Sequence, residues 1–126
     1  MINLPESAAE RKEIPIGTGL LDYFPSALAE VAKVSKKGND QHNPGQPLHW
    51  ARHKSTDQFD TIVRHLMQRG TRDTDGTLHS AKAAWRALAL LQEELEREAG
   101  FKPISPAETT TVTPAMLTND GITKNS

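Results

Sequence analysis

The sequence contains no cysteine, few aromatic residues and no excess of charge of either sign. Without cysteine the chain has no disulfides, no thiolate nucleophile and no thiolate-ligated zinc, which fits a reducing compartment. Its 15 basic residues nearly balance its 16 acidic residues, so it lacks the basic excess that nonspecific nucleic-acid binding requires. We therefore expect a cytoplasmic protein without a polynucleotide partner.

Long hydrophobic runs are also missing. The N-terminal stretch lacks the apolar core of a signal peptide, and no segment approaches the roughly 18 apolar residues of a membrane span, so we expect no membrane partner. At 126 residues the chain is long enough for one domain at most. Proline and glycine positions predict an irregular arm over residues 1–19 with one helical turn near its start, a domain over 20–100, and a tail over 101–126.

Two helices are predicted before the middle of the domain. Pro25 and Ser26 are typical of a helix start, so we predict a first helix over 26–37 that ends at Gly38. The Asn, Gly and Pro residues that follow predict a structured loop rather than a strand. A second helix is capped by Ser55 or Thr56 and ends at Gly70. Its apolar residues repeat at helical spacing and comprise Phe59, Ile62, Val63, Leu66 and Met67.

A third helix is predicted from residue 78 to about 98, with Thr77 as its cap. Its first half is apolar on nearly every face, and two partner helices in so short a chain can hardly cover it. We infer that a second copy of the chain packs against it. The predicted fold is therefore all-α, a small helical bundle of three main helices that is completed by oligomerisation.

Carboxylates on the second helix form the strongest candidate site. Asp57, Asp60 and Arg64 follow at i, i+3 and i+7, which places them on one stripe beside the apolar face. We expect Asp60 to be half-buried, and a half-buried carboxylate needs either a cation or Arg64 as its partner. The alternative is an ordinary ion pair on the helix surface.

Glu30 on the first helix supplies a third carboxylate. If the first two helices run antiparallel, Glu30 faces Asp57 and Asp60 and completes an oxygen-ligand set for Mg²⁺ or Mn²⁺. A solvated glutamate on an amphipathic helix is the alternative. Lys33 and Lys37 are candidates to bind phosphate, although lysines in a last helical turn also stabilise the helix end.

The segment after the second helix carries further polar candidates. Asp73 lies in the sequence RDTDG, where a turn with side-chain hydrogen bonds is at least as good an interpretation as a ligand site. His65 and His79 are candidates to donate to phosphate or to transfer protons, because imidazole titrates near neutrality. Trp50 in the long loop can stack on a purine or fill the core.

Together these motifs resemble a known family. The order ALAEVAKV, a loop with Gly and Asn, a Trp, DxxxxRHL, RG, DxDG, a His and AAWRALALL resembles the short phage and bacterial dATP/dGTP diphosphohydrolase domain. That group includes the phage MazZ enzymes and is similar to the all-α MazG-type nucleotide pyrophosphohydrolases. The resemblance covers roughly residues 20–93.

The resemblance implies a homo-oligomeric enzyme, either a dimer or a tetramer. It would cleave a purine deoxynucleoside triphosphate, dGTP or dATP, between the α and β phosphates, giving the monophosphate and pyrophosphate. In phages with 2-aminoadenine in their DNA such an enzyme, in the host cytoplasm, supplies dGMP for the modified nucleotide. The chain departs from the MazG-type pattern because Glu30 lacks a second acid on its helix, where position 27 is Ala and position 33 is Lys.

Residue roles follow from this comparison and from the chemistry of phosphate cleavage. Metal-bound phosphates are polarised, a carboxylate orients or deprotonates water, and a basic residue stabilises the leaving group. We assign Glu30, Asp57 and Asp60 to Mg²⁺ or Mn²⁺, with Glu30 and Asp60 also catalytic. The residues assigned to the substrate are Lys33, Lys37, Arg64, His65, Asp73 and His79. The competing hypothesis is a non-catalytic helical module whose apolar third helix binds a partner protein.

Overall fold

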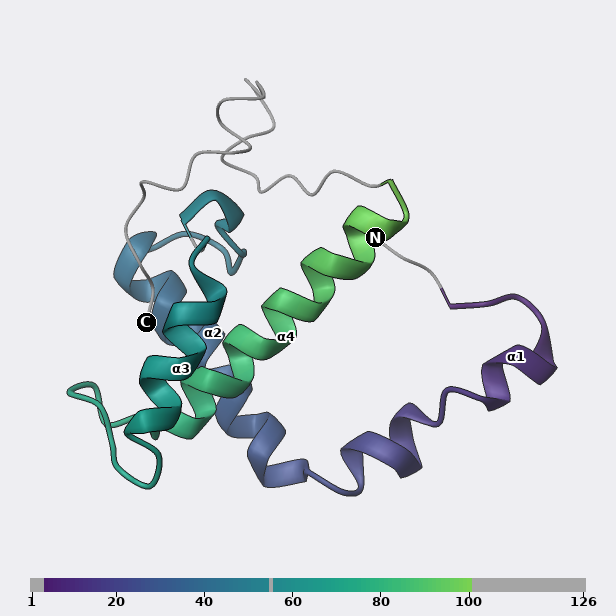
Figure 1. Cartoon of the computed structure of the whole chain (residues 1–126), viewed down its shortest axis with the longest axis horizontal. Coiled ribbons are helices and arrows are strands. Elements are labelled where there is room, and N and C mark those ends of the chain that lie inside the picture. The colour runs from purple at the N-terminus through teal and green to yellow at the C-terminus, as the bar shows by residue number, and fades with distance from the viewer. Residues whose placement is uncertain (1–3, 55, 101–126) are drawn as a thin grey trace.

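The computed structural model describes residues 4–54 and 56–100 (Figure 1). Within these ranges the chain forms helices and no named strand, and a single isolated bridge joins Arg72 to Leu78. The all-α fold predicted from the sequence is therefore confirmed. The elements in chain order are α1 (Ala8–Lys12), a π-helix (Gly17–Leu21), α2 (Pro25–His42), a 3-10 turn (Arg52–Lys54), α3 (Gln58–Met67) and α4 (His79–Glu98).

Helix α4 is the centre of the bundle. It packs against α3 along one side and against α2 along another, while α2 and α3 make little direct contact with each other. Helix α1 and the π-helix lie apart from this bundle (Figure 1) and have no buried residues. The turn predicted near Ser7 corresponds to α1, in which the Ser7 hydroxyl accepts a hydrogen bond from the Glu10 backbone N–H. The predicted tail over 101–126 lies outside the described residues.

Helix α2 is longer than predicted, because it continues through Gly38 to His42. Glycine has a low helix propensity, but contacts on both sides of it hold the helical conformation here. Lys36 pairs with Asp40 one turn later at 2.8 Å, and the buried Asn39 amide donates to the Gln46 carbonyl at 3.0 Å. The first part of the predicted loop is therefore the last turn of α2.

The starts of α3 and α4 also differ from the prediction. Asp57, rather than Thr56, occupies the N-cap position of α3, and Ser55 lies outside the described residues. Leu78 precedes α4 without a side-chain cap. Thr77 does not cap because its hydroxyl accepts a hydrogen bond from Lys37 at 2.7 Å, so a tertiary contact has replaced the local one. Helix α3 ends at Met67 with Gln68 as its C-cap, so it stops before Gly70, the predicted end, where φ is +82.

The interior of the described bundle is unusually polar. Its buried apolar side chains are all alanines, at positions 51, 81, 83 and 89. Helix α3 turns Gln58, Thr61 and His65 toward the interior, at i, i+3 and i+7, while Phe59 and Met67 are 73% and 77% exposed. The apolar face of α3 therefore points outward, and Asp60 beside it is exposed rather than half-buried as predicted.

Helix α4 likewise presents an outward apolar face. Leu88, Leu91 and Leu95 are each between 43% and 51% exposed. Together with Ala84, these leucines occupy positions i, i+4, i+7 and i+11 of the helix. Alternating spacings of four and three residues are typical of a helix face that packs against another helix. We call Ala84, Leu88, Leu91 and Leu95 the α4 seam. No helix within the described residues is both long and apolar enough to cross a membrane.

Candidate functional site

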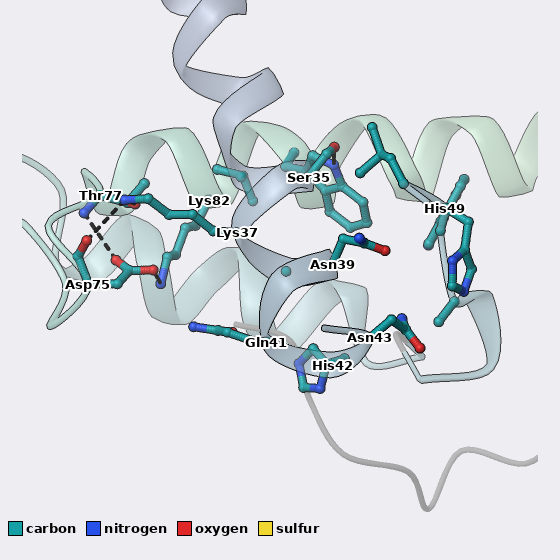
Figure 2. Close-up of a pocket in the computed structure, with 16 residues that line it drawn as sticks. Ser35, Lys37, Asn39, Gln41, His42, Asn43, His49, Asp75, Thr77 and Lys82 are labelled. Carbon is teal, nitrogen blue, oxygen red and sulfur yellow. Dashed lines mark hydrogen bonds and ion pairs between the residues drawn. The ribbon is translucent and has the colours of Figure 1, made fainter. Parts of the chain in front are cut away.

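A pocket of about 270 Å³ lies between α2, the loop that follows it, the turn before α4, and α4 itself. Figure 2 shows its two ends, one with charged side chains and the other with amide and aromatic groups. Residues from four separate segments meet here because α2 and the turn before α4 pack on the same part of α4. The lining includes Ser35, Lys37, Gly38, Asn39, His49, Trp50, Asp75, Thr77, Lys82 and Trp85.

Two lysines define the charged end of the pocket. Lys82 is nearly buried and pairs with the carboxylates of Asp73 at 2.7 Å and Asp75 at 3.1 Å. Lys37 instead donates to neutral oxygens, the Asp75 carbonyl at 2.9 Å and the Thr77 hydroxyl at 2.7 Å. Among the described residues no carboxylate forms an ion pair with Lys37, so its charge remains available to an anion.

The turn that carries these groups is fixed by its own hydrogen bonds. The Gly76 N–H donates to the Asp73 carbonyl at 2.9 Å, and the Asp73 N–H donates to the Thr77 carbonyl at 2.8 Å. Gly76 has φ +84, a conformation that glycine adopts without steric cost. The RDTDG segment is therefore both a tight turn and one wall of the pocket.

Aromatic side chains form the opposite end. The rings of Trp50 and Trp85 meet edge to face with centroids 5.6 Å apart, and the guanidinium of Arg52 lies 3.9 Å from the Trp50 ring centroid. Two buried polar atoms here have no partner within the described residues, the Oδ1 atom of Asn39 and the Nε1 atom of Trp50. One is an acceptor and the other a donor, and a buried group without a partner favours a ligand that supplies one.

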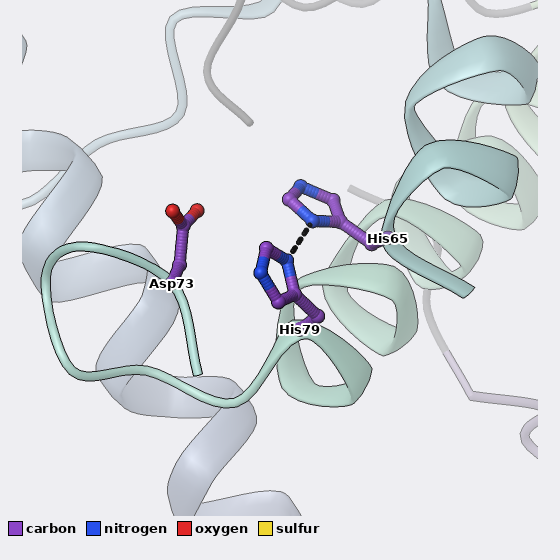
Figure 3. Close-up of side chains that lie close together, drawn as sticks. All are labelled: His65, Asp73 and His79. Atoms are coloured by element: carbon purple, nitrogen blue, oxygen red, sulfur yellow. Dashed lines mark hydrogen bonds between the residues drawn. The ribbon is translucent and has the colours of Figure 1, made fainter. Parts of the chain in front are cut away.

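A second polar cluster lies between α3, α4 and the turn (Figure 3). The Nδ1 atoms of His65 and His79 are 2.8 Å apart and both rings are buried. One ligand atom from each histidine and one from Asp73 lie within 4.8 Å of one another. Burial and the neighbouring His79 lower the pKa of His65 to about 4, and the hydrogen bond from Lys82 lowers the pKa of Asp73 to about 2.

The three carboxylates that the sequence analysis assigned to a metal do not lie close together as His65, Asp73 and His79 do. Glu30 pairs with Lys33 at 2.7 Å on α2, and this contact lowers the pKa of the Glu30 carboxyl. Asp57 lies 3.9 Å from the Arg86 guanidinium, while Asp60 is exposed on α3. Within the described residues the three do not form a group whose ligand atoms all lie within 4.8 Å.

The physical reason is the position of α4. The predicted ligand set required direct packing of α2 on α3, whereas both helices pack on α4 instead. Of the remaining residues assigned to the substrate, Lys37 lines the pocket, and Asp73 contacts it through Lys82. Lys33 lies on the exposed side of α2, and Arg64 donates to Thr61 at 3.2 Å on α3.

Several polar residues of the interior were not assigned to the site from the sequence. Arg86 is 1% exposed and donates to the Gln58 side chain at 3.2 Å, while its Nε and Nη2 atoms have no partner within the described residues. Its burial lowers the pKa of its guanidinium. Lys82 was also overlooked, although its position three residues after His79 places both on one face of a helix. The sequence signal that could have identified Arg86 and Lys82 was a charged residue on the buried face of an apolar helix.

The comparison with protein families agrees with the resemblance seen in the motifs. Residues 5–101 match the family described as dATP/dGTP diphosphohydrolase, N-terminal. The match begins closer to the N-terminus than the motifs themselves and includes α1 through α4. No curated protein and no solved structure matches the chain in the corresponding comparisons. Since the match covers most of the sequence, the chain belongs to the dATP/dGTP diphosphohydrolase N-terminal domain family.

Proposed function

We propose that this domain hydrolyses a purine deoxynucleoside triphosphate, dGTP or dATP, to the monophosphate and pyrophosphate, in a reaction that depends on Mg²⁺ or Mn²⁺. Membership of the family supports hydrolysis of a nucleoside triphosphate in general. The observation that carries the finer proposal is the polarity of the pocket in Figure 2, which has a cationic end and an aromatic end. A nucleotide has the matching pair of properties, an anionic phosphate chain and a flat aromatic base. By the same proposal the enzyme acts in phage nucleotide metabolism, in the pathway to 2-aminoadenine.

The volume of the pocket indicates which part of the nucleotide it receives. At about 270 Å³ it lies just below the range of about 300–1,000 Å³ that is usual for whole drug-sized ligands. We therefore assign it the base and sugar, with the phosphates leaving past Lys37. The Oδ1 atom of Asn39 accepts from an N–H of the purine, and the Trp50 indole N–H donates to a ring nitrogen or carbonyl of the base.

Lys37 is the residue that we assign to the phosphates. Its ammonium group is held in place by the Asp75 carbonyl and the Thr77 hydroxyl, and neither contact neutralises its charge. A preorganised cation stabilises negative charge that develops on a phosphate leaving group. Lys82 has two carboxylate partners, so its role in this proposal is to hold the turn rather than to bind phosphate.

Among the residues that the structure describes, the three carboxylates predicted as metal ligands do not form an assembled site. Glu30, Asp57 and Asp60 are separated in the way described above, and the closest partner of Glu30 is Lys33 rather than another acid. The catalytic roles of Glu30 and Asp60 stay predictions, as does metal ligation by Glu30, Asp57 and Asp60. Substitution of each residue by alanine tests these roles.

A panel of the four dNTPs, assayed with Mg²⁺ and with Mn²⁺ and followed by product analysis, tests the proposed reaction. We expect pyrophosphate and a deoxynucleoside monophosphate from dGTP or dATP, and little product from pyrimidine nucleotides. Release of inorganic phosphate or triphosphate would contradict the proposed bond. A protein that is inert with every dNTP would favour the non-catalytic interaction module instead.

The pocket assignment is tested by a matched pair of lysines on one helix. Lys37→Ala removes the cation at the charged end, and we expect kcat/KM to fall at least tenfold. Lys36→Ala is the control, since Lys36 is exposed and pairs with Asp40 one turn away. Equal activities of the two variants would rule out the role of Lys37.

We also propose that the α4 seam binds a second copy of the chain. The support is the contrast between the exposed leucines on α4 and the interior of the described part of the chain, whose buried apolar side chains are alanines. Burying a leucine fully contributes about 1.5–3 kcal/mol. Leu91→Lys is expected to convert the oligomer to a monomer in analytical ultracentrifugation. Ala32→Lys adds the same charge on the exposed surface of α2 and is expected to leave the oligomer intact.

A further inference from the structure

The cluster of His65, Asp73 and His79 has the composition and spacing of a metal site that neither the family description nor the predicted carboxylate set includes. We propose that these three side chains bind a divalent transition-metal ion such as Mn²⁺ or Co²⁺. The two imidazoles come from α3 and from the first residue of α4, and the carboxylate comes from the turn between them (Figure 3). One ion at this place would connect all three segments.

The distance between the two imidazoles agrees with ligation of a single ion. A zinc–imidazole bond is about 2.0–2.1 Å, and at that bond length two nitrogens at a right angle around one ion lie about 2.9 Å apart, and two at a tetrahedral angle about 3.4 Å apart. The Nδ1 atoms of His65 and His79 are 2.8 Å apart. This spacing matches neighbouring positions of an octahedral ion, with Asp73 and water as further ligands.

The His65 ring is not fully satisfied by protein groups. The residue is 3% exposed and its Nε2 atom has no partner within the described residues, so protein groups alone do not satisfy this ring.

Asp73 retains the capacity to bind an ion. Its Oδ2 atom accepts from Lys82 and its Oδ1 atom accepts from the Thr74 N–H at 2.7 Å. An ionised carboxylate has about four lone-pair sites, so each oxygen has one left. Lys82 opposes a second cation by charge, but the carboxylate of Asp75 lies 3.1 Å from it and offsets that charge.

The ligand types select the class of ion. Mg²⁺ prefers oxygen ligands and keeps several bound waters. Imidazole binds Co²⁺, Ni²⁺ and Zn²⁺ more strongly than Mn²⁺, and it binds Mn²⁺ more strongly than Mg²⁺. A site with two imidazoles and one carboxylate therefore favours a transition metal over Mg²⁺. The inference does not rest on the proposed hydrolase activity, because the cluster can be loaded and measured without nucleotide.

Electron paramagnetic resonance of Mn²⁺ titrated into the metal-free chain tests the proposal. We expect the six-line signal of free Mn²⁺ to be suppressed up to one ion per chain. Electron spin echo modulation from imidazole nitrogen should appear in the bound spectrum. His79→Ala and Asp73→Asn should each weaken binding at least tenfold, while His53→Ala, outside both the cluster and the pocket, should leave it unchanged. Circular dichroism establishes that each variant is folded.

Three results would overturn the proposal. The first is a wild-type chain that leaves millimolar Mn²⁺ free, which would mean that His65 and His79 form a hydrogen-bonded pair only. The second is bound Mn²⁺ without nitrogen modulation, which would place the ion on carboxylates elsewhere. The third is equal affinity in the wild type, His79→Ala and Asp73→Asn. Because the wild-type spectrum reports nitrogen ligands directly, the test does not depend on variants that fail to fold.

Discussion

The indole N–H of Trp85 donates to the Ser35 hydroxyl across 2.6 Å, and this contact joins the first half of α4 to α2. The two residues are 50 positions apart in the sequence, and both line the pocket. The same bond fixes the indole against which Trp50 packs edge to face. The aromatic end of the pocket therefore depends on one interhelical hydrogen bond.

Ser35→Ala leaves the Trp85 N–H without its partner, so we expect a loss of about 1–3 kcal/mol in the free energy of unfolding. Removing both partners in Ser35→Ala with Trp85→Phe should cost less than the sum of the single changes, since neither polar group is then left unpaired. Urea unfolding of the four proteins of this double-mutant cycle measures the coupling. A coupling energy near zero would show that the bond contributes nothing to stability.

Arg52 and Glu96 form a largely buried ion pair near the C-terminal end of α4. Their closest atoms are 2.6 Å apart, and the Glu96 side chain is 2% exposed. Glu96→Ala leaves a largely buried guanidinium without its carboxylate, and we expect a loss of about 3–5 kcal/mol. Asp40→Ala removes an exposed pair with Lys36 and should cost about 1 kcal/mol at most. Thermal unfolding of both variants compares them, and similar losses would contradict the burial argument.

The sequence predicted the number and type of the main helices well. Apolar periodicity located α2, α3 and α4, because a helix must bury or pair one face whatever its neighbours are. The helix ends were less accurate: Gly38 lies inside α2, and Thr77 does not cap α4. At Gly38 the local pair of Lys36 with Asp40 and the Asn39 side-chain amide hold the helix. At Thr77 a contact from Lys37 on another helix outweighed the local preference, and such a contact has no signature in the local sequence.

The candidate site was predicted in part. His65, Asp73 and His79 were all identified as polar candidates, but nothing in their spacing indicated that one turn would bring the three together. The set of Glu30, Asp57 and Asp60 relied on contact between α2 and α3, which α4 replaces. Periodicity also located the apolar stripe of α3 without showing its direction. It faces outward because Gln58 and His65 are the side chains that meet the polar groups of α4.

His65 gives the domain a predicted pH dependence in metal-free buffer that contains a chelator. The pKa of its ring is about 4 in the folded chain and about 6.5 when unfolded, so the unfolded chain binds more protons between these values. The stabilisation is fully present above pH 6.5 and is lost as the pH falls toward 4, by about 3 kcal/mol at most. Urea unfolding at pH 7 and pH 5 should show this loss in the wild type. The difference in unfolding free energy between pH 7 and pH 5 should be smaller in His65→Phe. An unchanged difference would assign the pH dependence to other groups.

Lys82 offers a prediction that connects stability to the proposed metal site. Lys82→Met leaves the carboxylates of Asp73 and Asp75 facing each other without their shared cation, and we expect a loss of about 2–4 kcal/mol in the free energy of unfolding. Mn²⁺ should restore much of this loss, because the variant retains His65, Asp73 and His79 and no longer repels a second cation. Thermal unfolding with and without Mn²⁺ measures both effects. Lys36→Met is the control, since that lysine pairs at the surface and Mn²⁺ should not alter its small effect. A Lys82→Met variant that is destabilised but gains no stability from Mn²⁺ would place the ion away from this cluster.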